Sequence, residues 1–254
     1  MYKDIKISDV KDFILRQFGE NPNICFYKGI SSNSGISDFL LTDYSKIRKS
    51  KTSKIHGNYY NTFLNNLDSW QTFPKRENSI IFTNEEETAQ AFASDKNYKF
   101  GKTFVVIPSN KSRIVISPAK DIWESFSQGL GKLSLRGKNN DLTIFNNCLH
   151  NIFEAYEVDG SRFNLTEIQT NLKIILNIGT KKELDFATTL LYNSLLKQRD
   201  NLPSYFDECF SPEQNGFEIV NYDLKWKLES RNKEIWTDSL AILINIDLLD
   251  EVLS

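Results

Sequence analysis

The sequence predicts an α+β protein whose mixed, mostly antiparallel sheet has flanking helices and a helical insertion. Two groups of β-branched and aromatic runs, within residues 24–116 and 217–244, have the composition and alternation of strands. Between these groups, apolar residues recur at helical spacing, so we expect an all-helical insertion at about 139–210. A chain of 254 residues with 40% hydrophobic content can bury a substantial core as one large domain or two small ones. Of these we expect a single domain spanning 1–254.

Charge and cysteine content argue against several classes of protein. The formal net charge is −2 and the isoelectric point is about 5.8, so the global charge does not drive the chain toward nucleic acid or an anionic membrane. Cys25, Cys148 and Cys209 lie far apart without metal-ligand spacing, which favours buried small residues over zinc ligands or disulfides. No apolar run approaches the length of a membrane span, so we expect a cytoplasmic protein without a membrane partner.

The N-terminal region predicts a helix followed by a strand. Residues 7–18 place apolar side chains on one face and precede Gly19, which is typical of a helix end. The run 24–27 has strand composition and leads into Lys28 and Gly29. Because glycine has no side chain, Gly29 lets the backbone turn or approach a ligand closely.

Residues 30–58 predict a long loop, rich in Ser, Asn, Gly and Lys, with a short apolar insert at 39–41. The loop carries a basic tract formed by Lys46, Arg48, Lys49, Lys51 and Lys54. This tract is either a solvated surface stretch or an arm that contacts phosphates. After the loop, residues 59–70 have helical periodicity, and their aromatic rings are either core residues or rings that stack on a bound ligand.

The stretch 70–93 predicts a strand that leads directly into a helix. A basic turn at 74–76 precedes the β-branched run 79–83, and Asn84 with the three glutamates after it marks the helix start. The helix has one small or apolar face that can pack on a sheet. Hydroxyl side chains therefore lie at both ends of the strand.

The remaining elements complete the sheet and the insertion. Strand patterns at 103–107 and 113–116 flank a Pro-Ser-Asn turn, so we expect them to form a hairpin. His150 lies off the apolar stripe of its helix, which favours a surface position over a catalytic one. We expect one further helix to begin at about 121–126, and three others to cover 141–156, 165–177 and 181–198. The last strands are expected at 217–220, 233–236 and 240–244.

Three short motifs resemble the NAD-binding core of ADP-ribosyltransferases. They are the run 26–29 with Lys28, the strand that begins with Ser79 and ends with Thr83, and Glu234 at the start of a late strand. That family carries an Arg or His near the end of its first strand, a Ser-x-x-x-Thr-like strand, and a Glu that introduces a late strand. The chain departs from this pattern because Lys28 stands where Arg or His is expected.

The resemblance implies a split sheet of the ADP-ribosyltransferase type, NAD as the cofactor and no metal. Glu234 would be the catalytic residue, because its carboxylate can orient the ribose and stabilise an oxocarbenium-like transition state. Asn232 stands where arginine-modifying members carry Glu, which argues against arginine as the acceptor. The residues implied to bind NAD are Tyr27, Lys28, Gly29, Ser79, Phe82 and Thr83.

The charged candidates also have ordinary structural interpretations. Lys28 would be a solvated lysine at a strand edge, and Glu234 an exposed carboxylate paired with a nearby cation. The cations nearby in the sequence are Lys225, Lys227 and Arg231. If the strand is displaced by one turn, Glu229 takes the place of Glu234.

The sequence therefore predicts NAD-dependent transfer of ADP-ribose to a macromolecular acceptor, either protein or nucleic acid. With water as acceptor, the protein would be an NAD glycohydrolase. One alternative is an inactive module of the same fold that binds nucleic acid or a protein; a nuclease or other hydrolase ranks lower, because no His, Asp and Glu cluster has ligand spacing. Heavy use of Asn, Lys, Ile and Phe suits a phage or mobile-element toxin of the host-cell cytoplasm, with an antitoxin or inhibitor protein as a further partner.

Overall fold

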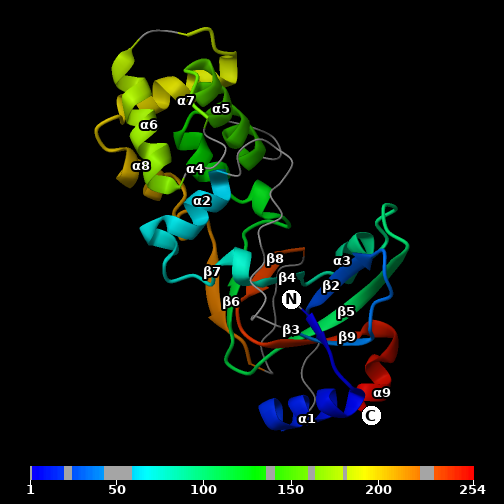
Figure 1. Cartoon of the computed structure of the whole chain (residues 1–254). Coiled ribbons are helices and arrows are strands. Elements are labelled where there is room, and N and C mark those ends of the chain that lie inside the picture. Colours follow the sequence, from blue (N-terminus) through cyan, green and yellow to red (C-terminus); the bar gives the residue numbers. More distant parts are fainter. Residues whose placement is uncertain are drawn as a thin grey trace. The chain divides into compact units, whose positions relative to one another are not determined.

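The chain forms a sheet unit and a helical unit in the computed structural model (Figure 1). The structure describes residues 2–19, 25–42, 59–135, 141–159, 164–179, 182–223 and 232–254. The sheet unit comprises 1–49, 74–120 and 218–254, and the helical unit comprises 50–73 and 121–217. Within the described residues there are nine α-helices and a nine-stranded sheet, which confirms the predicted α+β class.

All strands of the described residues belong to the sheet unit. Their spatial order is β1-β3-β9-β5-β2-β4-β8-β6-β7, and each neighbouring pair is antiparallel, so the parallel pairing that a mixed sheet implies is not found among them. The strands are β1 (Tyr2–Asp4), β2 (Tyr27–Ser32), β3 (Phe39–Thr42), β4 (Ile80–Thr83), β5 (Phe100–Pro108), β6 (Arg113–Ile116), β7 (Glu218–Asn221), β8 (Glu234–Thr237) and β9 (Ala241–Asn245).

Strands β2 and β4, at the centre of the sheet, share few backbone pairing positions. On one side, β2 pairs with β5 along its whole length, from Tyr27 to Ser32. On the other side, β2 pairs with β4 at a single position, Tyr27 opposite Thr83. Among the described residues, the strands β4, β8, β6 and β7 therefore pair with the other five strands at one position only.

The predicted hairpin of 103–107 and 113–116 is wrong, although both strands exist. β5 lies between β9 and β2, and β6 lies between β8 and β7. Both edges of β5 are thus occupied by other strands. In the turn between β5 and β6, Ser109 N donates to Leu240 O and Lys111 N donates to Tyr222 O, so the turn carries the chain from one part of the sheet to the other.

The predicted long loop at 30–58 is wrong in its first half. β2 continues to Ser32, and the apolar insert forms β3, which pairs with β1 and β9. Leu40 of β3 is buried, and the burial of its apolar side chain stabilises a strand within an otherwise polar stretch of the sequence. The basic tract from Lys46 to Lys54 lies outside the described residues, as do Lys225, Lys227, Glu229 and Arg231.

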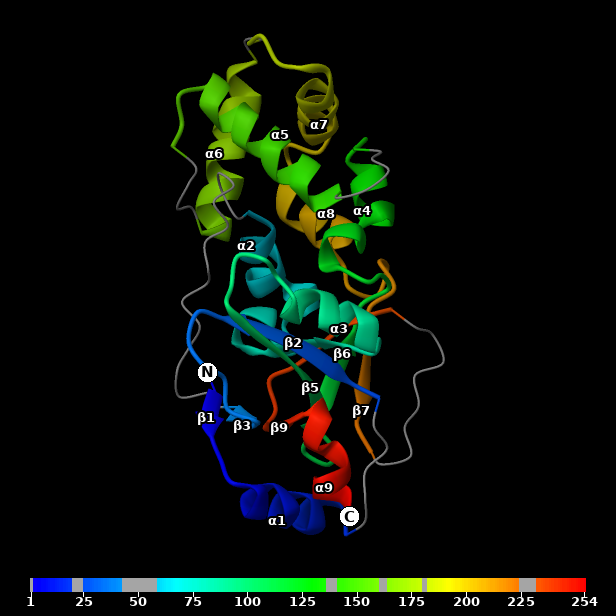
Figure 2. The same ribbon diagram turned by 90° about the vertical axis from the view of Figure 1, so that its right-hand side faces the viewer.

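The sheet unit has two buried clusters of apolar side chains. One cluster lies among strand residues such as Phe26, Phe82 and Phe104. The other contains Val105 and Ile244 together with apolar side chains of α1 (Ile7–Phe18) and α9 (Leu249–Leu253), which lie side by side in Figures 1 and 2. α1 has the predicted bounds, and it ends at Gly19, whose φ of 73° is the left-handed conformation that glycine adopts easily.

α3 (Glu86–Ala93) packs closely against the sheet at two glycines. A Cβ atom on Gly29 of β2 would lie 1.9 Å from Ala89 O, and one on Gly101 of β5 would lie 1.8 Å from Ala93 O. These distances are far below van der Waals contact. Both positions therefore need glycine, because the helix backbone occupies the space of a side chain.

The helical unit is built around aromatic side chains. Phe63 packs against Phe145, Phe206 and Phe210, with ring centroids 4.7–5.6 Å apart. The core interpretation of the aromatic segment 59–70 is therefore confirmed. The helices are α2 (Tyr59–Asn66), α4 (Ser127–Lys132), α5 (Asp141–Ala155), α6 (Leu165–Ile178), α7 (Phe186–Lys197) and α8 (Leu202–Cys209).

The helix predicted at 181–198 begins later than expected. Asp185 accepts a hydrogen bond from Thr188 N at 3.0 Å and so caps α7.

Cys148 and Cys209 are buried thiols, as expected, whereas Cys25 is half-buried. His150 is also half-buried, at 3.9 Å from the Glu154 carboxylate. Among the helices of the described residues, none combines the length and apolar character that crossing a membrane requires.

Candidate functional site

Three of the sequence-predicted residues form a row across the central strands. Tyr27 of β2 lies opposite Thr83 of β4, and Thr83 lies opposite Glu234 of β8. Residues directly opposite on neighbouring strands project to the same face, with Cβ atoms about 5 Å apart. The structure therefore brings together one residue from each of the three motifs, at the position where β2 and β4 meet.

Glu234 is held in place through its backbone. Its N–H donates to Ala119 O at 3.1 Å, and its carbonyl accepts from Ser117 N at 2.9 Å. Just before it, Lys233 N donates to Asn84 Oδ1 at 2.8 Å, and Lys233 Nζ donates to Pro118 O. The residue is only 9% exposed, which contradicts the interpretation of an exposed carboxylate.

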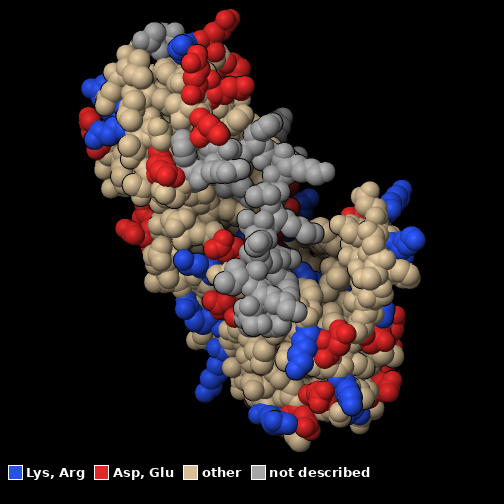
Figure 3. Space-filling view, in the orientation of Figure 1, with Lys and Arg blue, Asp and Glu red and all other residues tan. Residues whose placement is uncertain are grey.

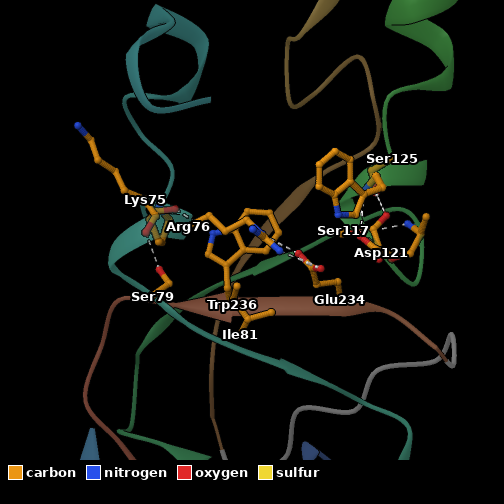
Figure 4. Close-up of polar contacts among 12 residues, drawn as sticks. Lys75, Arg76, Ser79, Ile81, Ser117, Asp121, Ser125, Glu234 and Trp236 are labelled. Atoms are coloured by element: carbon orange, nitrogen blue, oxygen red, sulfur yellow. Dashed lines mark hydrogen bonds and ion pairs between the residues drawn. The ribbon is translucent and has the colours of Figure 1, made fainter. Parts of the chain in front are cut away.

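Arg76 is the partner of the Glu234 carboxylate. Arg76 Nε donates to Glu234 Oε1 at 2.8 Å, and Nη2 donates to Oε2 at 3.2 Å. Figure 4 shows the two side chains pointing toward one another. This is a bidentate pair, the geometry in which a guanidinium binds a carboxylate most strongly.

The turn that carries Arg76 is fixed by two side chains. Ser79 Oγ donates to Lys75 O at 2.8 Å, and Trp236 Nε1 donates to Pro74 O at 2.9 Å (Figure 4). Ser79 is completely buried and lies just before β4 rather than in it. The structure thus places the Ser79 hydroxyl in a bond that shapes the turn, whereas the resemblance implied contact with a ribose.

Thr83 and the residues after it connect β4 to α3 and β8. Thr83 Oγ1 accepts from Glu85 N at 3.2 Å, and as a hydroxyl it can still donate. The expected helix start at Asn84 is displaced, because Glu85 occupies the position before the first helical residue. Asn84 instead accepts from the backbone of Lys233, which ties the end of β4 to the start of β8.

The remaining predicted residues have structural contacts of their own. Lys28 Nζ donates to Ile81 O and so bridges β2 and β4 just beyond their single paired position. Phe82 is buried against Phe26, with ring centroids 4.8 Å apart, so it belongs to the core. Burial, with a smaller contribution from the nearby Glu86 carboxylate, raises the pKa of Tyr27 above its ordinary value, so the phenol stays neutral.

Arg76 is a site residue that was not predicted from the sequence. Its signal is the basic turn at 74–76, which precedes the strand. Two cavities of the helical unit, of about 480 and 540 Å³, are lined by residues outside the candidate site. In Figure 3, positive and negative side chains are intermixed over the part of the sheet unit around α1 and α9, in keeping with the small net charge.

Comparison of the chain with protein-family models, curated proteins and solved structures found no match. The functional assignment therefore rests on the row Tyr27–Thr83–Glu234 and on the bidentate pair with Arg76. These side chains suit a dinucleotide. The Arg76 guanidinium can bind a pyrophosphate, while the Thr83 hydroxyl and the Glu234 carboxylate can bind a ribose.

Proposed function

We propose that this protein binds NAD and transfers ADP-ribose to a macromolecular acceptor. The observation that carries the proposal is the row of Tyr27, Thr83 and Glu234 on three adjacent central strands. Each residue comes from one of the three motifs that resemble the ADP-ribosyltransferase core. The motifs lie far apart in the sequence, so their meeting in one row supports the resemblance independently of composition.

The chemistry assigned to Glu234 follows from its position and charge. In the transfer, the bond between nicotinamide and the ribose carbon breaks, and the electron pair leaves with nicotinamide. Positive charge develops on the ribose, and a fixed carboxylate such as that of Glu234 stabilises it. The acceptor then forms a bond to the same carbon and gives up its proton to the solvent.

Thr83 would bind the nucleotide beside that carboxylate, and Lys28, whose side chain starts from the opposite face of β2, would reach it where the pairing of β2 and β4 ends. Lys28 supplies an ammonium near the line where β2 and β4 separate, where it can act as a point charge for a phosphate. The Thr83 hydroxyl can donate to a ribose oxygen. The acceptor would be a protein side chain or a nucleic-acid base, and an antitoxin or inhibitor protein would be a further partner of a toxin of this kind.

An inactive binding module of the same fold is the second candidate. Two observations favour it: Arg76 binds both oxygens of Glu234, and Lys28 Nζ is bonded to Ile81 O. In a module without activity, these contacts would be permanent and would serve only stability. This candidate predicts that the protein neither binds nor consumes NAD.

The test is an assay with NAD that carries a label on its adenylate part. Wild type, Glu234→Gln and the control Asp12→Asn are incubated with cell extract, and nicotinamide release and label in protein and RNA fractions are measured. Asp12 forms an exposed ion pair with Arg16, so this control removes a paired carboxylate from the surface. Transfer that is lost only in Glu234→Gln supports the proposal and names the acceptor. Release without transfer indicates water as acceptor, and no release by folded wild type favours the inactive module.

A further inference from the structure

We propose that Arg76 is a phosphate-binding residue whose guanidinium exchanges the Glu234 carboxylate for the pyrophosphate of NAD. The inference rests on the proposed function and deepens it, since it makes release of the catalytic carboxylate depend on dinucleotide binding. It starts from the bidentate pair, in which Nε and Nη2 of Arg76 bind the two oxygens of Glu234 at 2.8 and 3.2 Å.

The pair as it stands does not suit a carboxylate that stabilises positive charge. A guanidinium on both oxygens compensates the negative charge of Glu234 and places a full positive charge close to where the ribose becomes positive. Both effects oppose an oxocarbenium-like state. Arg76 must therefore move away from Glu234 before the carboxylate can act.

A phosphate is the natural second partner for this side chain. The planar fork of arginine matches phosphate oxygens as well as it matches a carboxylate, whereas a lysine ammonium acts only as a point charge. Lys28 stands where the resembling family carries Arg or His, so the residues of the three motifs themselves supply no forked cation. Arg76 supplies one on the same side of the sheet as Glu234.

Hydrogen bonds hold the backbone around Arg76, and its side chain borders solvent. The bonds from Ser79 Oγ to Lys75 O and from Trp236 Nε1 to Pro74 O hold the turn before β4 at Pro74 and Lys75. The Arg76 side chain is 21% exposed and that of Glu234 is 11% exposed, so the pair borders solvent. The exchange needs rotation of one side chain, and no strand has to shift.

A purely structural ion pair and an exchanging one predict different effects on NAD affinity. If the pair only stabilises the fold, loss of either partner leaves NAD binding unchanged or weakens it. If Glu234 competes with NAD for Arg76, removal of the carboxylate charge makes Arg76 more available. Glu234→Gln should then bind NAD more tightly than wild type, a result that structural damage does not produce.

The experiment is a calorimetric titration of NAD into wild type, Glu234→Gln, Arg76→Lys, Arg76→Ala and the double variant Arg76→Ala with Glu234→Gln. We expect Glu234→Gln to bind several times more tightly, and Arg76→Ala at least about tenfold more weakly, because a charge-assisted hydrogen bond is lost. Arg76→Lys should be intermediate, because it keeps the charge without the fork. In the double variant, the tightening by Glu234→Gln should disappear.

Arg16→Ala is the matched control, because it removes an exposed arginine from a carboxylate pair. It should leave NAD affinity unchanged, and inorganic pyrophosphate should compete with NAD for wild type far better than for Arg76→Lys. If wild type binds NAD but Glu234→Gln binds it no more tightly, the exchange is refuted while the proposed function stands. If folded wild type does not bind NAD, both are refuted. Arg76→Lys keeps the test valid even if Arg76→Ala does not fold.

Discussion

Arg76 and Glu234 are 158 residues apart in the sequence, and the Arg76 guanidinium binds both carboxylate oxygens of Glu234. The contact joins the turn before β4 to the first residue of β8. It is mostly shielded from solvent, and it links the turn that leads into the second motif to the third motif. Stability and the proposed chemistry therefore depend on the same pair.

Removal of Arg76 should destabilise the fold as well as alter ligand binding. We expect Arg76→Ala to lower the free energy of unfolding by about 2–3 kcal/mol, because a largely buried carboxylate loses its partner. Urea denaturation measures this change. The exposed ion pair of Arg16 and Asp12 is the control, because Arg16→Ala should change the free energy of unfolding by no more than about 0.5 kcal/mol. Equal effects of the two substitutions would mean that the Arg76 pair contributes no more than a surface contact.

Gly29 should be needed for packing against α3. Gly29→Ala places a Cβ atom 1.9 Å from Ala89 O, so the helix has to move. We expect a loss of about 3 kcal/mol or more in the free energy of unfolding. Gly35→Ala is the control, because a Cβ atom there meets nothing within 4 Å, and its effect should stay within about 0.5 kcal/mol. A stable Gly29→Ala protein that loses only NAD binding would instead support direct ligand contact at this glycine.

Ser79 should act on stability through the turn it fixes. Ser79→Ala removes the hydroxyl that donates to the Lys75 carbonyl, which still accepts from Asn78 N, and we expect a loss of about 0.5–1.5 kcal/mol in the free energy of unfolding. Ser34→Ala, at an exposed serine whose hydroxyl contacts Ser32, is the control and should be nearly neutral. Thermal or urea unfolding decides the matter. Unchanged stability with a large fall in nicotinamide release would show that the hydroxyl contacts the ribose after all.

Asp38 should make the stability of the sheet unit depend on pH. Hydrogen bonds from Lys102 and Asn245 hold the pKa of the Asp38 carboxyl below its ordinary value of 3.8. A carboxyl whose pKa is lower in the folded state contributes stability above the unfolded pKa and loses it as the pH falls through the folded pKa. Asp38→Asn should therefore be less stable than wild type at neutral pH, with the difference shrinking below pH 3.8. A difference that does not change with pH would rule out this linkage.

Much of the fold was predictable because its elements have strong local patterns. The helices of the insertion and the strands β5, β6 and β9 follow from apolar spacing, which depends only on neighbouring residues. Strand partners do not follow from such patterns. The Pro-Ser-Asn turn looked like a hairpin turn, but β9 and β2 already pair with both edges of β5. β3 was missed because four residues within a polar stretch give too short a signal.

The candidate site was predictable in part for the same reason. Thr83 and Glu234 could be named from their motifs, and the structure places them opposite each other. The partner of Glu234 could not be named, because sequence neighbours suggested lysines and an arginine close to it, whereas Arg76 reaches it from a distant turn. The roles of Ser79 and Phe82 also depend on burial, which a short motif does not report.

The central claim is that the row Tyr27–Thr83–Glu234 forms a site that consumes NAD. The most direct test is nicotinamide release from NAD by purified wild type and Glu234→Gln, at NAD concentrations that saturate each protein, with Asp12→Asn as control. We predict release by wild type and by Asp12→Asn, and a fall of at least about a hundredfold in Glu234→Gln despite its bound NAD, because a carboxylate that stabilises the transition state is lost. Equal rates in wild type and Glu234→Gln, or no release by folded wild type, would contradict the account.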